Sequence, residues 1–488
     1  MNRQIVQLFG LTLVLFAVLI GFTSRWTVFE AESLEDNALN KRPLLEQQQV
    51  PRGLIFARDG STVLAQSDPQ GRGKRRTYRR SYPEGELFSQ PVGYSFIDRG
   101  EVGIEKSRND ALTGDLNEFG TIFRELQGGD REGDDVVTTL DPAAQQTAYD
   151  ALGGRAGAIV ALEPATGRVR VMASTPTYDP NRVADTDYFD ELRLDTEGRP
   201  LTNRVTQPRY QPGSTFKVVT AAAALDTGKV TPETIVDGSS PQTISGAPLA
   251  NSGNVDYGPI SFTDALTNSV NTVFARVGEQ VGRGTLLEYM DRFGFNRDPQ
   301  LDFPDDQMEV SGIRNSEGRL VTADDGWDVG RVAIGQGGAE GQIQVTPIQM
   351  AEVAAAVANG GALIRPRLTE RVVGQDGRVE ERIDPAQQAQ VMKPETAAQL
   401  TEMMGRVVEE GTGTQAALSG VSVAGKTGTA EIGADASLNQ VWFIGFAPVE
   451  SPRYAIAVTL DDQPIGTSGG EYAAPLAAQV LQTLLGGG

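Results

Sequence analysis

The sequence predicts a multidomain α+β protein with three parts: an N-terminal transmembrane helix, a strand-rich segment, and a domain in which helices cover one antiparallel sheet. Three observations lead to this prediction. One long apolar stretch stands at the N-terminus, short strand-like runs with Gly, Pro and Asp turns follow it, and the last third ends in three strand-like runs and an apolar helix. The length of 488 residues suits two to four domains of about 150 residues each.

The composition excludes several classes of function. A net charge of -21 argues against nucleic acid as the main partner. The sequence contains no cysteine and no histidine, so disulfides, the usual zinc sites and a Ser-His-Asp triad are all excluded. Among the 43 basic residues only seven are lysines, and each lysine is therefore more informative than usual.

The N-terminal stretch Gln4–Ser24 is uncharged between Arg3 and Arg25. As a helix at about 1.5 Å per residue it is long enough for the roughly 30 Å hydrocarbon core of a bilayer. Trp26 and Phe29 follow, where aromatic side chains favour the membrane interface. A cleaved signal peptide is the competing interpretation, but no A-x-A-like cleavage site closes the stretch. We expect an uncleaved anchor, and Arg3 weakly favours a cytoplasmic N-terminus.

The segment 30–140 reads as strands and loops. Val50–Ser67 predicts a hairpin with Asp59-Gly60 as its turn. The basic run Arg72–Arg80 is interpreted as a solvated loop or exposed strand, with contact to an anionic lipid, polymer or partner as the alternative.

A linker helix is predicted at 141–155. Asp141 suits the N-cap, Pro142 the first helical position, and Gly153-Gly154 the C-terminal end. We place the domain boundary here, with 1–29 as the cytoplasmic end and anchor.

The last domain is expected to comprise 156–488. It opens with two apolar strand-like runs around a Glu-Pro-Ala-Thr-Gly turn, within Ala156–Ser174. Near its end stand three further strand candidates and a closing helix, with the sequences VSVAGKTGTAEI, QVWFIGFAPV, RYAIAVTLDD and YAAPLAAQVLQTLL.

Ser214 is the candidate nucleophile. It follows the Pro212-Gly213 turn and begins a strong helix-forming run that ends at Gly228. Free N–H groups and the dipole at a helix start favour developing negative charge. Lys217, three residues on, lies on the same face of the first turn, so we expect its amine to hydrogen-bond the Ser214 hydroxyl and accept its proton.

A lysine is an effective base only when its pKa is lowered. Burial and a second nearby cation both lower it, and Lys426 in GKTGT is the candidate second cation. The Ser-x-x-Lys spacing alone is a weak signal, because an N-capping Ser with a solvated Lys produces the same pattern.

Two further motifs strengthen the prediction. Ser-x-Asn occurs at Ser252–Asn254, Ser269–Asn271 and Ser437–Asn439, but only Ser269 precedes a convincing helix. Lys426-Thr427-Gly428-Thr429 is the rarer motif. The three motifs in this order form a known catalytic set.

With these residues the sequence resembles the penicillin-binding proteins and serine β-lactamases. The resemblance covers nearly the whole chain. It includes ALEPATGRVRVMASTPTYDPN, GQGGAEGQIQVTPIQMAEVAAAVANGG with Thr346 as N-cap and Pro347 at N1, and VWFIGFAP. The upstream stretches PRGLIF, YRRSYPEG and GIEKSRNDALTG resemble the pedestal of class B enzymes. The resemblance implies a β-lactamase/transpeptidase-like fold for 156–488 and a pedestal or dimerisation-type domain for 30–140.

The resemblance also implies roles for these residues. Ser214 is the nucleophile that forms an acyl-ester, and Lys217 is the general base. Ser269 and Asn271 complete a proton relay and hold the substrate peptide. The Lys426-Thr427-Gly428-Thr429 strand binds the substrate, with its lysine and threonines on the terminal carboxylate. The backbone N–H groups of Ser214 and Thr429 are the expected oxyanion hole.

The implied function is a membrane-anchored peptidoglycan D,D-transpeptidase. It acts on D-Ala-D-Ala stem peptides, is inhibited by β-lactam antibiotics and uses neither metal nor cofactor. The resemblance also implies an extracytoplasmic catalytic domain and a membrane-embedded glycan polymerase as partner.

The alternatives are a β-lactam-hydrolysing or carboxypeptidase relative, a non-catalytic β-lactam sensor and a scaffold. A class A β-lactamase has a Glu-x-x-x-Asn segment, which we do not find between Ser269 and Lys426, and a sensor is expected to have several membrane spans. The residues before Trp442, Asn439-Gln440-Val441, and Ala57 depart from common family patterns, but neither departure touches a catalytic position.

Overall fold

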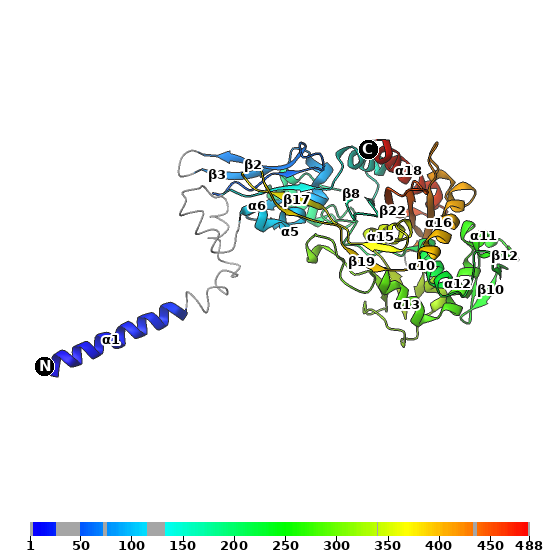
Figure 1. Cartoon of the computed structure of the whole chain (residues 1–488), viewed down its shortest axis with the longest axis horizontal. Helices are drawn as coiled ribbons and strands as arrows, with labels where there is room; N and C mark the ends of the chain where they lie inside the picture. The colour runs from blue at the N-terminus through cyan, green and yellow to red at the C-terminus, as the bar shows by residue number, and fades with distance from the viewer. Residues whose placement is uncertain are drawn as a thin grey trace. The chain divides into compact units, whose positions relative to one another are not determined.

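The computed structural model describes residues 3–25, 49–71, 76–114, 132–338, 340–432 and 437–486. These residues belong to two compact units (Figure 1). The first unit comprises Met1–Pro51 and Asp68–Arg79, and the second comprises Arg52–Ser67 and Arg80–Gly488.

The first unit contains helix α1 (Arg3–Ser24), whose residues are uncharged after Arg3. Its mean hydropathy of 2.5 and its length of 22 residues suffice to cross a bilayer. The predicted apolar helix at Gln4–Ser24 is therefore confirmed as a helix. Trp26 and Phe29 lie outside the described residues, as does part of the basic run Arg72–Arg80.

The five-stranded sheet of the second unit has the order β20-β21-β22-β7-β8, with every neighbouring pair antiparallel. All five strands are among those predicted. Their bounds are β7 (Gly157–Leu162), β8 (Val169–Thr175), β20 (Ala424–Ile432), β21 (Leu438–Ala447) and β22 (Tyr454–Pro464). This confirms the prediction of an antiparallel sheet.

Helices cover both faces of this sheet. Side chains alternate between the faces along a strand, and on β21 Val441 and Phe443 belong to one hydrophobic core while Trp442 and Ile444 belong to the other. Helices α8 (Pro142–Leu152) and α18 (Ala474–Gly486) pack on the first face. Helix α15 (Pro347–Ala358) packs on the second, with α10 (Lys217–Asp226) in the same core.

Two predicted helix ends can be compared with the structure. The Asp141 carboxylate accepts a hydrogen bond from Ala144 N, and Gly153 adopts a left-handed φ of 58°, so α8 begins and ends as predicted. Thr346 is the N-cap position of α15, but its side chain makes no capping hydrogen bond. Instead its backbone N–H donates to Ser311 Oγ at 3.0 Å, a contact made by the fold and invisible in the local sequence.

The other helices of the second unit surround the helical core. Their bounds are α4 (Ser89–Val92), α5 (Gly103–Ser107), α6 (Asn109–Thr113), α9 (Thr186–Leu194), α11 (Phe262–Thr267), α12 (Asn271–Val281), α13 (Arg283–Arg292), α14 (Val329–Ala333), α16 (Pro394–Glu409) and α17 (Gly469–Tyr472).

Short strands form the smaller sheets of the second unit. Their bounds are β4 (Ser95–Phe96), β5 (Gly100–Glu101), β9 (Ile235–Asp237), β10 (Gln242–Ile244), β11 (Ala247–Leu249), β12 (Pro259–Ser261), β13 (Gly312–Arg314), β14 (Gly337–Gly338), β15 (Gly341–Gln344), β16 (Ala362–Ile364) and β19 (Gln387–Gln390).

A second large sheet has the order β18-β17-β6-β1-β2-β3. Its strands are β1 (Ile55–Phe56), β2 (Val63–Gln70), β3 (Thr77–Ser81), β6 (Asp135–Thr138), β17 (Thr369–Val373) and β18 (Val379–Arg382); β2 and β3 each contain residues of both units. The pairing of β1 with β2 and the φ of 67° at Gly60 confirm the predicted hairpin.

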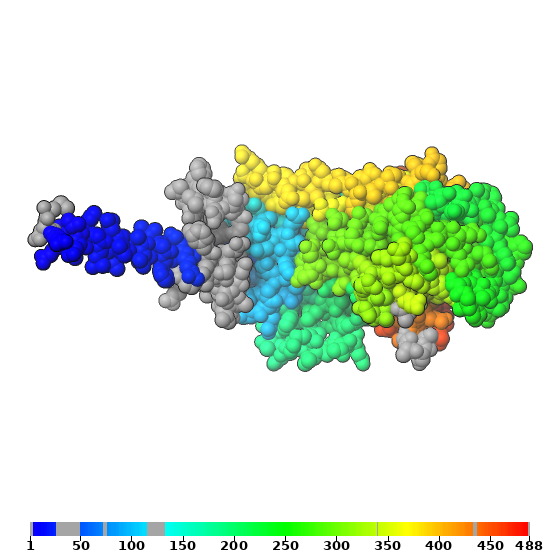
Figure 2. Space-filling model, turned by 90° about the horizontal axis from the view of Figure 1, so that it is seen from below, coloured from blue at the N-terminus to red at the C-terminus, as the bar shows by residue number. Residues whose placement is uncertain are grey.

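This sheet mixes two regions of the sequence. Strand β17 pairs with β6, so residues from the predicted segment 156–488 complete a sheet begun by the predicted segment 30–140. In Figure 2 the yellow surface that includes β17 and β18 runs along the upper edge of the second unit. A single boundary in the sequence cannot describe such an exchange of strands.

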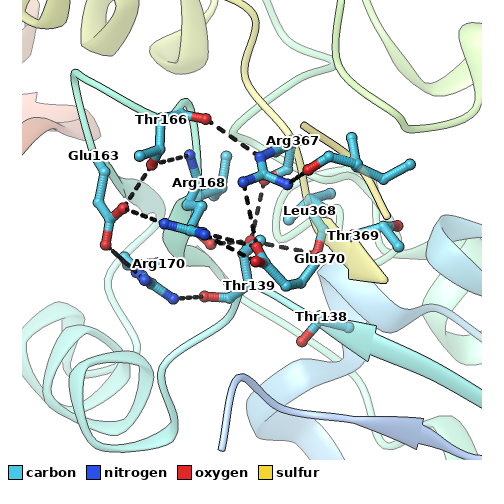
Figure 3. A network of polar contacts seen from close by, with 12 residues as sticks. Thr138, Thr139, Glu163, Thr166, Arg168, Arg170, Arg367, Leu368, Thr369 and Glu370 are labelled. Carbon is cyan, nitrogen blue, oxygen red and sulfur yellow. Dashed lines mark hydrogen bonds and ion pairs between the residues drawn. The ribbon is translucent and has the colours of Figure 1, made fainter. Parts of the chain in front are cut away.

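A polar network lies where the two sheets approach each other (Figure 3). Arg168, the residue before β8, donates two hydrogen bonds to Glu370 of β17, at 2.7 and 2.8 Å. Arg170 donates to Glu163 at 2.6 and 2.9 Å and to Thr139 O at 2.8 Å. Bidentate pairs of this kind are geometrically specific. Together these contacts connect the β7–β8 hairpin to β17 and to Thr139, the residue after β6.

Candidate active site

Three segments of the second unit bring the predicted site residues together. Ser214 lies in a 3-10 turn (Gly213–Phe216) that leads into α10, where Lys217 is the first residue. Ser269 and Asn271 lie at the start of α12. Lys426-Thr427-Gly428-Thr429 lie on β20, an edge strand of the five-stranded sheet.

The helix that carries Ser214 begins differently from the prediction. Its first turn is a 3-10 helix, and α-helical geometry starts at Lys217. The half-buried Ser214 hydroxyl makes no hydrogen bond with any residue of the described ranges, so the expected bond to Lys217 is not present in this structure. The difference arises because the Lys217 amine is held by other partners.

Close backbone packing surrounds Gly213. Its φ of 51° is left-handed, and a Cβ at this position would lie 2.5 Å from Thr429 O. Its N–H donates to Gly335 O at 3.1 Å. Gly335 is also left-handed, and a Cβ there would lie 1.8 Å from Gly213 O. These two glycines allow the Ser214 turn, the β20 backbone and the loop after α14 to meet.

Lys217 has no exposed surface. Its Nζ donates to Ser269 O at 2.7 Å and to Asn271 Oδ1 at 2.8 Å, and it lies 3.2 Å from Ser269 Oγ. A neutral amine has two N–H groups and one lone pair. The two short bonds can occupy both N–H groups and leave the lone pair for a hydroxyl proton.

Burial first, and the nearby Lys426 ammonium second, hold the pKa of Lys217 well below its usual range. Burial also lowers the pKa of Lys426 to about 7. No carboxylate forms an ion pair with either amine among the described residues. The site therefore favours a neutral lysine beside Ser214 near neutral pH, as the chemistry of a lysine base requires.

Ser269 lies between the two lysines. Its Oγ is 3.2 Å from Lys217 Nζ and 2.9 Å from Lys426 Nζ. Its φ of 57° is unusual for a residue other than glycine, and such backbone conformations concentrate at functional sites. Helix α12 begins at Asn271, so Ser269 precedes this helix as predicted, and Ser269 and Val270 form the turn that leads into it.

The four residues of the β20 motif have distinct surroundings. Lys426 Nζ also donates to Thr427 O at 3.0 Å. Thr427 Oγ1 lies 2.6 Å from Thr412 Oγ1, and Thr429 Oγ1 accepts a hydrogen bond from Gly469 N at 3.3 Å. Gly428 packs against the nucleophile turn, since a Cβ there would lie 2.7 Å from Pro212 O.

Sequence reasoning missed several residues that hold the site. Trp442 Nε1 donates to Gln211 O at 2.9 Å and thereby anchors the segment before Ser214. Thr412 reaches Thr427, and Gly335 supports Gly213. The Gly-rich stretch GQGG and the lone Trp of β21 were visible signals, but their partners lie over 100 residues away in the sequence.

The other Ser-x-Asn matches lie elsewhere. Ser252–Asn254 forms a short 3-10 turn and Ser437–Asn439 leads into β21, whereas the Lys217 amine binds only Ser269 and Asn271 among the three matches. In the described ranges no group of three or more acidic side chains is arranged to hold a metal ion.

The chain is similar to known proteins over nearly its whole length. Residues 157–482 match the penicillin binding protein transpeptidase domain, and residues 52–136 match the penicillin binding protein A dimerisation domain. The chain is 34% identical to the peptidoglycan D,D-transpeptidase PbpA of Mycolicibacterium smegmatis, over 99% of each chain.

Solved structures of one mycobacterial protein are also similar. The ceftriaxone acyl-enzyme complex of penicillin-binding protein A from Mycobacterium tuberculosis has a TM-score of 0.81 and 31% identity, covering 90% of this chain and all (100%) of that one. The penicillin G acyl-enzyme complex of the same protein has a TM-score of 0.78 and 32% identity, covering 89% of this chain and 100% of that one.

Proposed function

The chain belongs to the class B penicillin-binding proteins, with mycobacterial penicillin-binding protein A among its relatives, and from this premise we propose that Ser214 is the acylated nucleophile of a peptidoglycan D,D-transpeptidase. The protein is a serine-type D-Ala-D-Ala transpeptidase that cross-links cell-wall peptidoglycan and is inhibited by β-lactams. The observation that carries the assignment of roles is the buried Lys217 amine, which has a lowered pKa, binds Ser269 and Asn271, and lies one turn after Ser214.

In the acylation step Lys217 accepts the proton of the Ser214 hydroxyl. Ser214 Oγ bonds to the carbonyl carbon of the penultimate D-Ala, and the peptide bond to the terminal D-Ala breaks. Lys217 then passes this proton to the released amine through Ser269 Oγ, which lies within hydrogen-bond distance of both lysines, so that Lys217 is neutral again. The Ser214 and Lys217 side chains are not bonded in the free enzyme, and catalytic hydrogen bonds often tighten only when substrate binds.

In the second step the amine of a neighbouring stem attacks the Ser214 ester. Lys217 again receives a proton, now from the attacking amine, and returns one to the departing Ser214 Oγ. The net reaction exchanges one amide for another and needs no metal or cofactor. We assign Lys426, Thr427 and Thr429 to the terminal carboxylate, with Gly428 permitting their close approach to the nucleophile turn. The N–H groups of Ser214 and Thr429 are the assigned oxyanion donors.

The apolar helix α1 indicates single-pass membrane anchoring. We assign its N-terminus to the cytoplasm and the catalytic part to the extracytoplasmic side, where the substrate of such enzymes lies. We assign 30–140 to a pedestal, 141–155 to a linker helix and 156–488 to a transpeptidase domain, with β17 and β18 of the last segment completing the sheet of the pedestal. A membrane-embedded glycan polymerase is the proposed partner, because the strand-rich pedestal is too short for a polymerising domain.

Intact mass of the full-length chain in detergent, followed for hours after addition of benzylpenicillin, tests this proposal. We expect a persistent adduct on the wild type, none on Ser214→Ala, and an unaltered adduct on the matched control Ser316→Ala, whose serine is exposed. An adduct that disappears as drug is consumed would support a β-lactamase instead. A folded wild type without an adduct would favour the scaffold alternative.

A further inference from the structure

A cavity of about 260 Å³ lies beside the proposed active site. Its walls include Tyr210 and Gln211, Gln342 of β15, and Gln440 of β21. Gln211 precedes Ser214 by three residues, so their Cα atoms are no more than about 11 Å apart. Gln440 is paired across the sheet with Ala430, the residue after Thr429. The cavity therefore adjoins the end of β20 that extends beyond the Lys426-Thr429 motif.

Asp461, one of the residues that line the cavity, belongs to a buried ion pair. Arg204 has no exposed surface, and its Nε donates to Asp461 Oδ2 at 3.0 Å. Tyr210 Oη donates to the same oxygen at 3.1 Å, and Gln440 Nε2 donates to Asp461 Oδ1 at 3.2 Å. Asp461 is thus fully satisfied by protein partners. It serves as a rigid wall rather than as a free ligand.

Two opposite charges at the mouth of the cavity remain available. Arg199 has a side chain that is 46% exposed, and its one ion pair in the described ranges is a long contact of 3.9 Å with Asp461. Asp462 is exposed and forms no ion pair within those ranges. The other cation of the lining, Arg209, is already paired with Glu309. The lining of the cavity therefore offers one guanidinium, that of Arg199, and one carboxylate, that of Asp462.

Both residues are held in uncommon backbone conformations. Arg199 has a φ of 45° and Asp462 a φ of 50°, each in the left-handed region that costs free energy for a residue other than glycine. The Arg199 carbonyl and the neighbouring Gly198 carbonyl both accept hydrogen bonds from Arg204, so the buried pair fixes the Arg199 turn. The fold thus holds the Arg199 and Asp462 side chains at the same cavity although their backbone conformations cost free energy.

We propose that this cavity is the subsite for the residue that precedes D-Ala-D-Ala in the donor stem, when that residue is a diamino acid whose side chain ends in its own amino and carboxylate groups. Arg199 binds the carboxylate and Asp462 binds the ammonium group. The proposal rests on the function proposed above and specifies the substrate of the same site.

The direction of the donor follows from the strand geometry. β20 has a free edge along which an extended peptide can lie as an added strand. With the terminal carboxylate at Lys426-Thr429, an antiparallel stem advances by about 3.3 Å per residue toward Ala430–Ile432. Ile432 is also part of the cavity wall. The side chain of the preceding residue therefore lies next to the cavity mouth.

The test uses the full-length chain in detergent and two synthetic stems that end in D-Ala-D-lactate. One has diaminopimelate before the D-Ala and the other has lysine, which lacks the side-chain carboxylate. Acylation of Ser214 is followed by intact mass, and each rate is expressed relative to benzylpenicillin acylation of the same variant. Acylation by benzylpenicillin shows that a variant is folded and that its Ser214 reacts. A result that refutes the subsite is therefore distinguishable from one that refutes the proposed function.

We expect the wild type to prefer the diaminopimelate stem by at least about tenfold, the effect of one charged hydrogen bond. Arg199→Gln and Asp462→Asn each remove one of the two charges and are expected to lose this preference. Asn is chosen at position 462 because it tolerates a positive φ. Arg199→Lys is expected to restore part of it. The matched controls Arg193→Gln and Asp376→Asn, at exposed positions outside the cavity, are expected to keep the preference.

Three results would overturn the proposal. The first is an equal rate for both stems in the wild type. The second is a variant effect confined to the partition of the acyl-enzyme between water and an added acceptor amine, which would assign the cavity to the acceptor instead. The third concerns the case in which neither stem acylates the enzyme. The two stems are then compared as competitors of benzylpenicillin acylation, and we expect the diaminopimelate stem to slow this acylation more than the lysine stem does. Equal competition by the two stems, or none by either, would refute the donor subsite.

Discussion

We expect Glu352 of α15 to make the stability of this protein depend on pH. Its side chain is buried, the carboxyl group accepts no hydrogen bond from any described residue, and burial raises its pKa from 4.5 to about 8 against an opposing effect of Arg297. Below pH 4.5 both the folded and the unfolded chain keep the proton. As the pH rises from 4.5 to 8 the unfolded chain loses the proton while the folded chain retains it, so the free energy of unfolding falls.

The size of the effect follows from the two pKa values. The interval from 4.5 to about 8, at about 1.4 kcal/mol per pH unit, corresponds to roughly 5 kcal/mol of unfolding free energy. Glu352→Gln keeps the shape of the side chain and removes the titration. We expect the variant and the wild type to have similar stability near pH 4.5, and the variant to be more stable by several kcal/mol near pH 8.

Urea unfolding of the full-length chain in detergent, followed by tryptophan fluorescence from pH 4.5 to 8.5, measures this difference. Trp327 and Trp442 are fully buried and report the loss of packing. Glu402→Gln, at an exposed position of α16, is the matched control and is expected to follow the wild type at every pH. A difference between Glu352→Gln and the wild type that stays constant with pH would refute the reasoning.

Three further predictions concern the proposed active site and the junction. The Lys426 ammonium helps to lower the pKa of Lys217, so Lys426→Gln is expected to slow benzylpenicillin acylation and to move the acid limb of the pH–rate profile to higher pH. An acid limb at the same pH in the variant would show that Lys426 does not influence the pKa of Lys217. Gly335→Ala is expected to reduce the acylation rate by at least about tenfold, since its Cβ collides with Gly213 O and displaces the Ser214 turn. The control Gly284→Ala, with open space around its Cβ, is expected to acylate normally in the same mass assay. Glu370→Ala removes the bidentate partner of Arg168 and is expected to lower the unfolding free energy by about 1–3 kcal/mol in urea, whereas a loss within about 0.5 kcal/mol would show that the junction network is dispensable.

Local signals in the sequence were sufficient for the elements of the fold. The Asp59-Gly60 turn, the Asp141-Pro142 helix start and the strand at QVWFIGFAPV each depend on a few consecutive residues, and the structure has each of them where predicted. The order and spacing of Ser214-x-x-Lys217, Ser269-x-Asn271 and Lys426-Thr427-Gly428 identified the residues that the fold brings together. Such patterns are readable because backbone geometry and capping act over one or two turns.

Only the tertiary structure decided how those residues meet. The Lys217 amine binds Ser269 and Asn271 rather than the nearby Ser214, because the packing of α10 against α12 places these two acceptors beside the buried amine. Gly335 contacts Gly213 of the Ser214 turn, Trp442 anchors Gln211, and β17 completes a sheet that begins before residue 140. Contacts of this kind depend on packing between segments far apart in sequence, where no short pattern records the partner. The sequence alone therefore determined which side chains to expect at the proposed active site, and close packing in three dimensions determined their hydrogen bonds and lowered the pKa of Lys217.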